Sequence, residues 1–255
     1  MKKIISLILI VPLFVSQAMA WGQTGHRVVG LVAQEHLNKK AQKKVMQVLQ
    51  NNSLAEVANW MDDIKSDAAY NHTHDWHWVT IPDGIKYEQT EKNPKGDLLM
   101  KIEEIVAALK AHNLSPEKEQ ENLKYLAHLV GDLHQPLHVG GKDDTGGNAV
   151  KLQWFGQPSN LHRVWDSDMI EGKDLSYTEL ANFLGEPTKA QVKEWQAKTV
   201  RDWAYGMMVY RPQVYNLPAD NKLSYRYSYD NFNTVQQLLL QGGVRLAGLL
   251  NEIYG

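Results

Sequence analysis

Two histidine–aspartate pairs in the chain share one spacing. His128 and Asp132 are four residues apart in a segment with helical periodicity, so both side chains lie on one face of a helix. His162 and Asp166 repeat this spacing, and His138 lies between the two pairs. A single such pair is usually a surface hydrogen bond. Two pairs and a third histidine in a chain without cysteine indicate a metal site, because imidazole and carboxylate groups both bind zinc.

Four further residues are candidate ligands, each with a simpler alternative. Removal of the first twenty residues would free the amine of Trp21, whose pKa of about 8 suits a neutral nitrogen ligand. His26 lies about one helical turn further along. Asp62 and His77 complete the set. The alternative for Trp21 is an ordinary exposed terminus, and for His26 a capping or core histidine. Asp62 could instead be a carboxylate on a helix surface, and His77 part of an aromatic cluster in the core.

The first twenty residues have the pattern of a signal peptide. A short basic start precedes an apolar run over 4–15, and Ala18-Met19-Ala20 supplies the small residues of a cleavage site. We expect cleavage between Ala20 and Trp21 and a secreted or periplasmic protein; an uncleaved anchor is the alternative. No later apolar stretch is long enough to span a bilayer, so no membrane association is expected after cleavage.

Composition limits how the chain can bind a polyanion. It has 27 basic and 29 acidic side chains and no cysteine, which excludes disulfides and thiolate ligands. Without Lys2 and Lys3 the mature chain has 25 basic against 29 acidic side chains, a formal net charge of −4. Proteins that bind nucleic acid through their overall field are basic. Any binding of a polyanion must therefore depend on a local positive feature, such as bound metal ions.

The positioning elements are predicted to be helices of one all-α, mainly helical domain over 21–255, with a small extended or β-hairpin element. Periodicity predicts helices over 23–37, 39–49, 54–64, 98–111, 119–133, 161–169, 189–210 and 229–253. Segments 75–81 and 148–155 are read as short strands or extended loops. In the helix over 119–133, His128 and Asp132 lie opposite an apolar stripe and are expected to point away from the main core.

The chain resembles the zinc-dependent single-strand-specific nucleases, such as mung bean nuclease and the fungal nucleases S-one and P-one. These proteins share a fold with bacterial zinc-dependent phospholipase C. The resemblance covers essentially the whole mature chain. It is carried by Trp21-Gly22 with His26, Trp60-Met61-Asp62, His77-Trp78, His128-Leu129-Val130-Gly131-Asp132, Gln135-Pro136-Leu137-His138, Gly146-Gly147-Asn148, Asn160-Leu161-His162 and Trp165-Asp166.

The resemblance implies three zinc ions in one cleft, held by nine residues. The first ion would be bound by Asp62, His77, His128 and Asp132. The second would be bound by the amine and carbonyl of Trp21, by His26 and by Asp132, which bridges this close pair. The third would be bound by His138, His162 and Asp166. A close metal pair lowers the pKa of a water molecule and so supplies a hydroxide nucleophile.

The reaction implied is cleavage of single-stranded DNA and RNA to 5′-phosphate products, with removal of 3′-phosphates from nucleotides. Lys65 is expected to stabilise charge in the transition state, or else to be a solvated helix lysine. Trp78 would stack a base, which suits cutting without sequence preference. Asn148 resembles the residue with which members of this family contact the substrate near the phosphate. Packing or turn roles are the alternatives for Trp78 and Asn148.

Two other functions stay open. A phospholipase C on the same fold is the first, although its last ligand would be Glu where this chain has Asp166. A non-catalytic exported zinc-binding protein is the second. We expect a monomer without a stable protein partner. The remaining histidines are interpreted as surface residues or as neighbours of the ligands; they are His36, His72, His74, His112 and His134.

Overall fold

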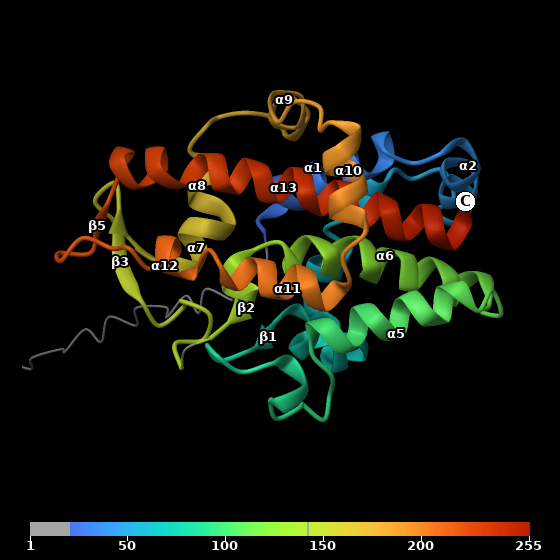
Figure 1. Cartoon of the computed structure of the whole chain (residues 1–255), viewed down its shortest axis with the longest axis horizontal. Helices are drawn as coiled ribbons and strands as arrows, with labels where there is room; N and C mark the ends of the chain where they lie inside the picture. The colour runs from blue at the N-terminus through green and yellow to red at the C-terminus, as the bar shows by residue number, and fades with distance from the viewer. Residues whose placement is uncertain (1–20, 142) are drawn as a thin grey trace, which may run out of the picture.

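The computed structural model describes residues 21–141 and 143–255, so the predicted signal peptide over 1–20 lies outside the described residues. Helices dominate, which confirms the predicted mainly helical class; in Figure 1, β3 and β5 lie at one end of the molecule and β1 and β2 lie below α11. Within the described ranges, no helix is long and apolar enough to cross a membrane.

The helical elements vary widely in length. In chain order they are α1 (Gln23–Glu35), α2 (Lys39–Val48), α3 (Leu54–Val57), α4 (Trp60–Asp63), η1 (Ile64–Ser66), η2 (Ala68–His77), η3 (Tyr87–Gln89), α5 (Leu98–Lys110), α6 (Pro116–Leu133), η4 (Pro136–His138), α7 (Leu161–Arg163), η5 (Val164–Asp168), α8 (Met169–Glu171), α9 (Tyr177–Phe183), α10 (Lys189–Gln196), α11 (Val200–Met208), α12 (Arg211–Val214) and α13 (Tyr225–Tyr254). All η elements are 3₁₀ helices except η5, which is a π-helix.

Helix α6 lies at the centre of the fold. It packs against α1, α3, α4, α5 and α13, and the long α13 runs along the molecule beside it (Figure 1). Every residue from Tyr125 to Leu133 is buried. The expectation that His128 and Asp132 point away from the core is therefore wrong. Their face of α6 is covered by α1 and α4, so both side chains lie in the interior.

The helix predicted over 54–64 is broken into α3, α4 and η1. In an unbroken helix the amide of Asp62 would bond to the carbonyl of Ala58. The amide of Asp62 bonds instead to the carbonyl of Asn59 at 2.9 Å, and that carbonyl also accepts from the amide of Asp63 at 3.1 Å, as in a regular helix. The carbonyl of Ala58 accepts a hydrogen bond from Nδ1 of His128 at 2.7 Å. The break thus supplies a backbone acceptor to a histidine of α6.

Two more predicted helices are interrupted. The segment over 189–210 forms α10 and α11, because Thr199 caps the second helix and Asp202 bonds back to the Thr199 amide. The segment over 161–169 is helical, but its middle is the π-helix η5, which contains Asp166. Helices α9 and α12 and the 3₁₀ helices η2, η3 and η4 were not predicted.

The strands form two small sheets. Strands β1 (Val79–Thr80) and β2 (Val139–Gly140) pair in parallel. The second sheet has the order β4-β3-β5, with β3 (Lys151–Trp154) antiparallel to β4 (Gln157–Asn160) and parallel to β5 (Lys222–Leu223). The extended segment predicted over 148–155 thus contains a strand. The segment over 75–81, also predicted to be extended, is extended only from Trp78 onward, because η2 continues to His77.

Candidate metal centre

The first histidine–aspartate pair lies in the buried middle of α6. His128 and Asp132 are both fully buried. Because the carbonyl of Ala58 can only accept a hydrogen bond, Nδ1 of His128 carries the proton that it donates. Nε2 of His128 is therefore the nitrogen with a lone pair. It faces Oδ2 of Asp132 at 3.4 Å and Oδ1 of Asp62, from α4, at 3.7 Å.

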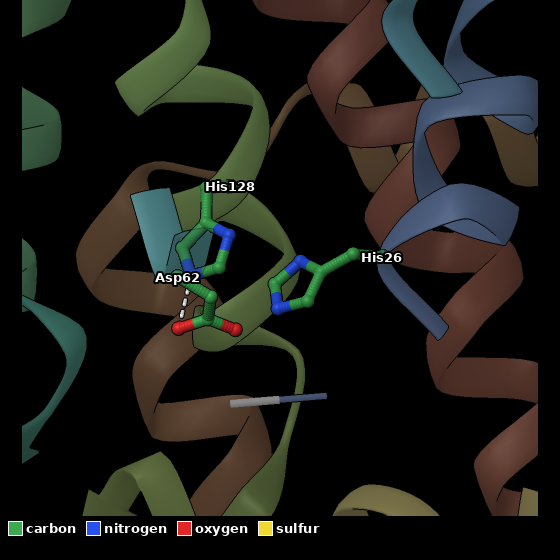
Figure 2. A group of neighbouring side chains, drawn as sticks. All are labelled: His26, Asp62 and His128. Atoms are coloured by element: carbon green, nitrogen blue, oxygen red, sulfur yellow. Dashed lines mark ion pairs between the residues drawn. The ribbon is translucent and has the colours of Figure 1, made fainter. Parts of the chain in front are cut away.

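His26, from α1, completes this group (Figure 2). Figure 2 shows the side chains of His26, Asp62 and His128 pointing toward one another from three different helices. The rings of His26 and His128 stack with centroids 3.9 Å apart and planes 13° apart. Nε2 of His26 lies 3.3 Å from Oδ1 of Asp132.

His77 approaches the other oxygen of Asp132. Its Nδ1 lies 2.9 Å from Oδ2 of Asp132 and 3.2 Å from Nε2 of His128. Asp132 therefore has one carboxylate oxygen near His26 and the other near His77 and His128. This is the arrangement that a carboxylate shared between two metal ions requires.

A second group contains His138, His162 and Asp166. Nδ1 of His138 donates to the carbonyl of His77 at 2.6 Å, and Nδ1 of His162 donates to that of Gly146 at 2.7 Å. Both Nε2 atoms therefore face Asp166. They lie 3.7 Å (His138) and 2.8 Å (His162) from its two oxygens. Backbone carbonyls thus fix the tautomer of each histidine, as is usual for metal ligands.

The chemistry of these donor atoms fits divalent cations. Potential ligand atoms lie within 4.8 Å of one another in three groups: His26, Asp62 and His128; His77, His128 and Asp132; His138, His162 and Asp166. Within the described ranges, both ring nitrogens of His26 and Nε2 of His77 and of His138 are buried without a hydrogen-bond partner. A metal ion bound in the first of these groups would satisfy one nitrogen of His26, and one bound in the last would satisfy Nε2 of His138; buried nitrogens without a partner are otherwise costly.

The ionisation of the buried groups favours the same conclusion. Burial, assisted by neighbouring positive groups, lowers the pKa of His26 and His77 well below the usual value. Burial lowers the pKa of His128 to about 4. These imidazoles are therefore neutral near pH 7, which is the form that binds metal. Burial and the nearby Asp62 carboxylate raise the pKa of Asp132, so a cation is needed to stabilise its ionised form.

Trp21 and Gly22 lie next to the second group. The amide of Gly22 donates to the carbonyl of Asp166 at 2.7 Å, and the indole of Trp21 is fully buried. The start of the predicted mature chain is thereby fixed beside a candidate ligand.

Three predicted residues lie outside the ligand groups. Nζ of Lys65 lies 2.5 Å from Oδ1 of Asp62. Trp78 directly follows His77 and is 46% exposed, and it lines a cavity of about 280 Å³ with Thr80 and the 91–94 loop. Asn148 donates from its side chain to the carbonyl of Thr145 at 2.9 Å, as expected for its alternative turn role.

Sequence reasoning missed residues that support the ligands. The side-chain amide of Gln135 donates to Oδ1 of Asp166, and its oxygen accepts from the amide of Leu137. Gln135 was noticed only as part of a motif. His134, expected at the surface or beside the ligands, is fully buried, and its Nε2 lies 2.8 Å from Nη1 of Arg245. No signal in the sequence identifies the partner of His134.

Fold and site together define a mainly helical protein with a buried histidine–carboxylate centre suited to several metal ions. A family model described as S1/P1 Nuclease matches residues 21–255. Endonuclease 3 of Arabidopsis thaliana is 30% identical, over 97% of this chain and 93% of its own length. Nuclease P1 of Penicillium citrinum is 27% identical, over 92% and 98%. Nuclease S1 of Aspergillus oryzae (strain ATCC 42149 / RIB 40) is 25% identical, over 91% of both.

The chain belongs to the S1/P1 nuclease family. It is therefore a hydrolase that acts on phosphoric ester bonds. Nucleases of this family depend on zinc, and the histidine and aspartate groups described above could hold such an ion.

Proposed function

We propose that the chain is a zinc-dependent endonuclease that hydrolyses single-stranded DNA and RNA to 5′-phosphate products and removes 3′-phosphates from nucleotides. The observation that carries this proposal is the convergence of the eight predicted side-chain ligands on two adjoining buried clusters. Contacts between His77 and both clusters, through Asp132 and His138, support one connected centre.

The proposed centre binds three zinc ions. Asp132 would be the residue shared between two of the ions, since its two oxygens face different histidines. The pair would be completed by Trp21, His26, Asp62, His77 and His128. The third ion would be bound by His138, His162 and Asp166. When bound, the zinc ions supply Lewis acidity, which activates water and neutralises charge on a phosphodiester.

Lys65 is proposed to stabilise negative charge on the reacting phosphate. Its ammonium group lies beside Asp62 and its side chain is 14% exposed, so it is anchored at the edge of the cluster. The mature chain is acidic overall, so positive charge for a polyanion must be concentrated at the site.

Trp78 is proposed to select single strands. Its indole is exposed while the preceding residue, His77, is a candidate ligand, so a base stacked on the ring would stay close to the metal centre. Stacking accepts any base, but duplex DNA keeps its base faces covered. Asn148 is proposed to contact the substrate from the loop that also positions His162 through Gly146.

Export is the proposed route to this active form. Cleavage between Ala20 and Trp21 would release the amine that serves as a zinc ligand, and the secreted or periplasmic protein would act as a monomer. The family match also begins at residue 21.

The decisive experiment uses the chain beginning at Trp21, incubated with single-stranded DNA, RNA and a 3′-nucleotide, with and without a chelator. Zinc per chain is measured in the same samples. Chelator-sensitive cleavage to 5′-phosphates with about three zinc ions per chain supports the proposal. Phospholipid hydrolysis without nucleic acid cleavage supports a phospholipase C. Bound zinc without turnover of either substrate supports a zinc-binding protein.

A further inference from the structure

Helix α12 and the residue that follows it, Tyr215, contain no candidate metal ligand. The helix packs against η4, the turn that ends at His138. Hydrogen bonds nevertheless connect residues 211–215 to the three chain segments that carry His138, His162 and Asp166. These three segments are separated in the sequence.

Arg211 connects α12 to two short strands. Its buried guanidinium donates from Nη2 to the carbonyls of Val139 at 2.7 Å and Ile81 at 2.8 Å, and from Nη1 to Asp83 at 2.5 Å. Val139 directly follows His138 and opens β2, and Ile81 follows β1. One side chain therefore fixes the strand pair that carries the backbone away from His138.

Tyr215 connects α12 to the loop that orients His162. Its hydroxyl donates to Oδ2 of Asp144 at 2.7 Å. Oδ1 of Asp144 accepts from the amide of Gly147 at 3.0 Å. The neighbouring carbonyl, of Gly146, is the one that accepts from Nδ1 of His162.

Val214 completes the set of connections. Its carbonyl accepts from the hydroxyl of Tyr227 at 2.5 Å, and that hydroxyl also accepts from Nε1 of Trp165 at 2.9 Å. Trp165 directly precedes Asp166 and is fully buried. The path from α12 to the third ligand segment therefore consists of two buried hydrogen bonds.

We propose that residues 211–215 form a brace that positions the third metal site, with Arg211 as its principal positioning residue. This inference rests on the proposed function for the assignment of His138, His162 and Asp166 as a zinc site. Arg211 spans carbonyl acceptors at Val139 in β2 and at Ile81 just after β1 with a planar group of several donors, which the single ammonium of lysine cannot reproduce. Asp83, by contrast, is 76% exposed, so its pairing with Arg211 contributes little.

The test compares zinc binding by the chain beginning at Trp21 and by its variants, using a competing zinc-binding dye. We expect Arg211→Met and Arg211→Lys to weaken the third zinc equivalent about 10- to 100-fold, the range seen when groups that support metal ligands are lost. Tyr215→Phe should weaken it a few-fold. Asp83→Asn should bind zinc as the unaltered chain does.

Arg201→Met is the matched control. Arg201 also bonds to groups on two elements, Glu88 and Glu103, but neither adjoins a candidate ligand. His162→Ala provides a reference in which the third site is already damaged. If Arg211 acts through this site, Arg211→Met should cause no further loss of zinc in the His162→Ala chain.

Two results would overturn the brace. The first is an unchanged third zinc affinity in Arg211→Met with only a lower melting temperature. The second is an equal loss from all zinc sites. If Arg211→Met does not fold, Tyr215→Phe decides, because it removes a single hydroxyl: normal zinc binding there refutes the proposal. Zinc affinity is measured without substrate, so a chain that binds zinc but cuts no nucleic acid refutes the proposed function and leaves this test intact.

Discussion

Substitution of Gly131 by alanine should weaken metal binding while leaving helix α6 folded. Gly131 precedes Asp132 in α6, and the His26 ring packs directly against it. A Cβ atom at this position would lie 2.8 Å from Nδ1 and 3.1 Å from Cε1 of His26. Ordinary contacts begin at 3.4 Å, so the ring must retreat by about 0.6 Å. Retreat from α6 also carries Nε2 of His26 away from Asp132.

The size of the effect follows from this displacement. Metal–ligand distances are held to within about 0.2 Å, so a shift of about 0.6 Å removes His26 as an effective ligand or distorts the site around it. The stacked ring of His128, with its centroid 3.9 Å away, limits the alternative positions. We expect zinc affinity at the close pair to fall by about 10- to 100-fold, which is roughly 1.4 to 2.7 kcal/mol.

Stability of the metal-free chain should change much less. Alanine favours a helix over glycine by about 1 kcal/mol, and overpacking costs about 1–3 kcal/mol, so the two effects partly cancel. Gly206→Ala in α11 is the control, because nothing lies within 4 Å of its added Cβ and only the helix term applies. The assay measures zinc per chain, zinc affinity and phosphodiester hydrolysis. Unchanged zinc affinity and hydrolysis in Gly131→Ala would refute the inferred role of this close contact.

Three further predictions concern the proposed ligands and the base platform. Trp78→Ala should raise KM for single-stranded substrates about 5- to 150-fold, from the loss of about 1–3 kcal/mol of stacking, with zinc content unchanged; a normal KM would exclude stacking on this ring. One extra residue before Trp21 should abolish most activity and lower zinc content, whereas full activity would refute the terminal amine as a ligand. Asp132→Asn should disturb both zinc ions of the pair, and three zinc ions per chain would show that Asp132 is not shared.

The sequence predicts the long helices well because each has strong periodicity, and some, such as α5 and α6, also begin at a capping residue. Ser115 and Pro116 at the beginning of α6 are such a signal, although the helix was predicted to begin only at residue 119. The capping box of Thr199 and Asp202 is also a signal in the sequence, and it predicts that α11 begins there, separately from α10. The break at Ala58 and Asn59 could not be predicted from the local sequence, because the residue that bonds to the Ala58 carbonyl is a histidine 70 residues away in the sequence.

The candidate site was predictable to a similar degree. Residue types and spacing identify His128, Asp132, His162 and Asp166 as possible ligands. Their surroundings are not encoded in any local pattern. The expectation that the α6 pair points away from the core failed because a single helix cannot reveal that α1 and α4 cover its polar face. Backbone acceptors are equally invisible, since every residue has a carbonyl and only the fold determines which one is left available.

Three irregular segments of the fold supply backbone acceptors to the site. A carbonyl inside a regular helix is already bonded to an amide four residues later, so it is a poor partner for a ligand histidine. The three candidate ligand histidines whose Nδ1 donates to a backbone carbonyl use carbonyls outside such a pattern: Ala58 at the break between α3 and α4, His77 at the end of η2, and Gly146 in a loop. The π-helix containing Asp166 fits this view, since such elements often occur at functional sites. Closing these interruptions would give a more regular helical protein, but it would remove the groups that orient His128, His138 and His162.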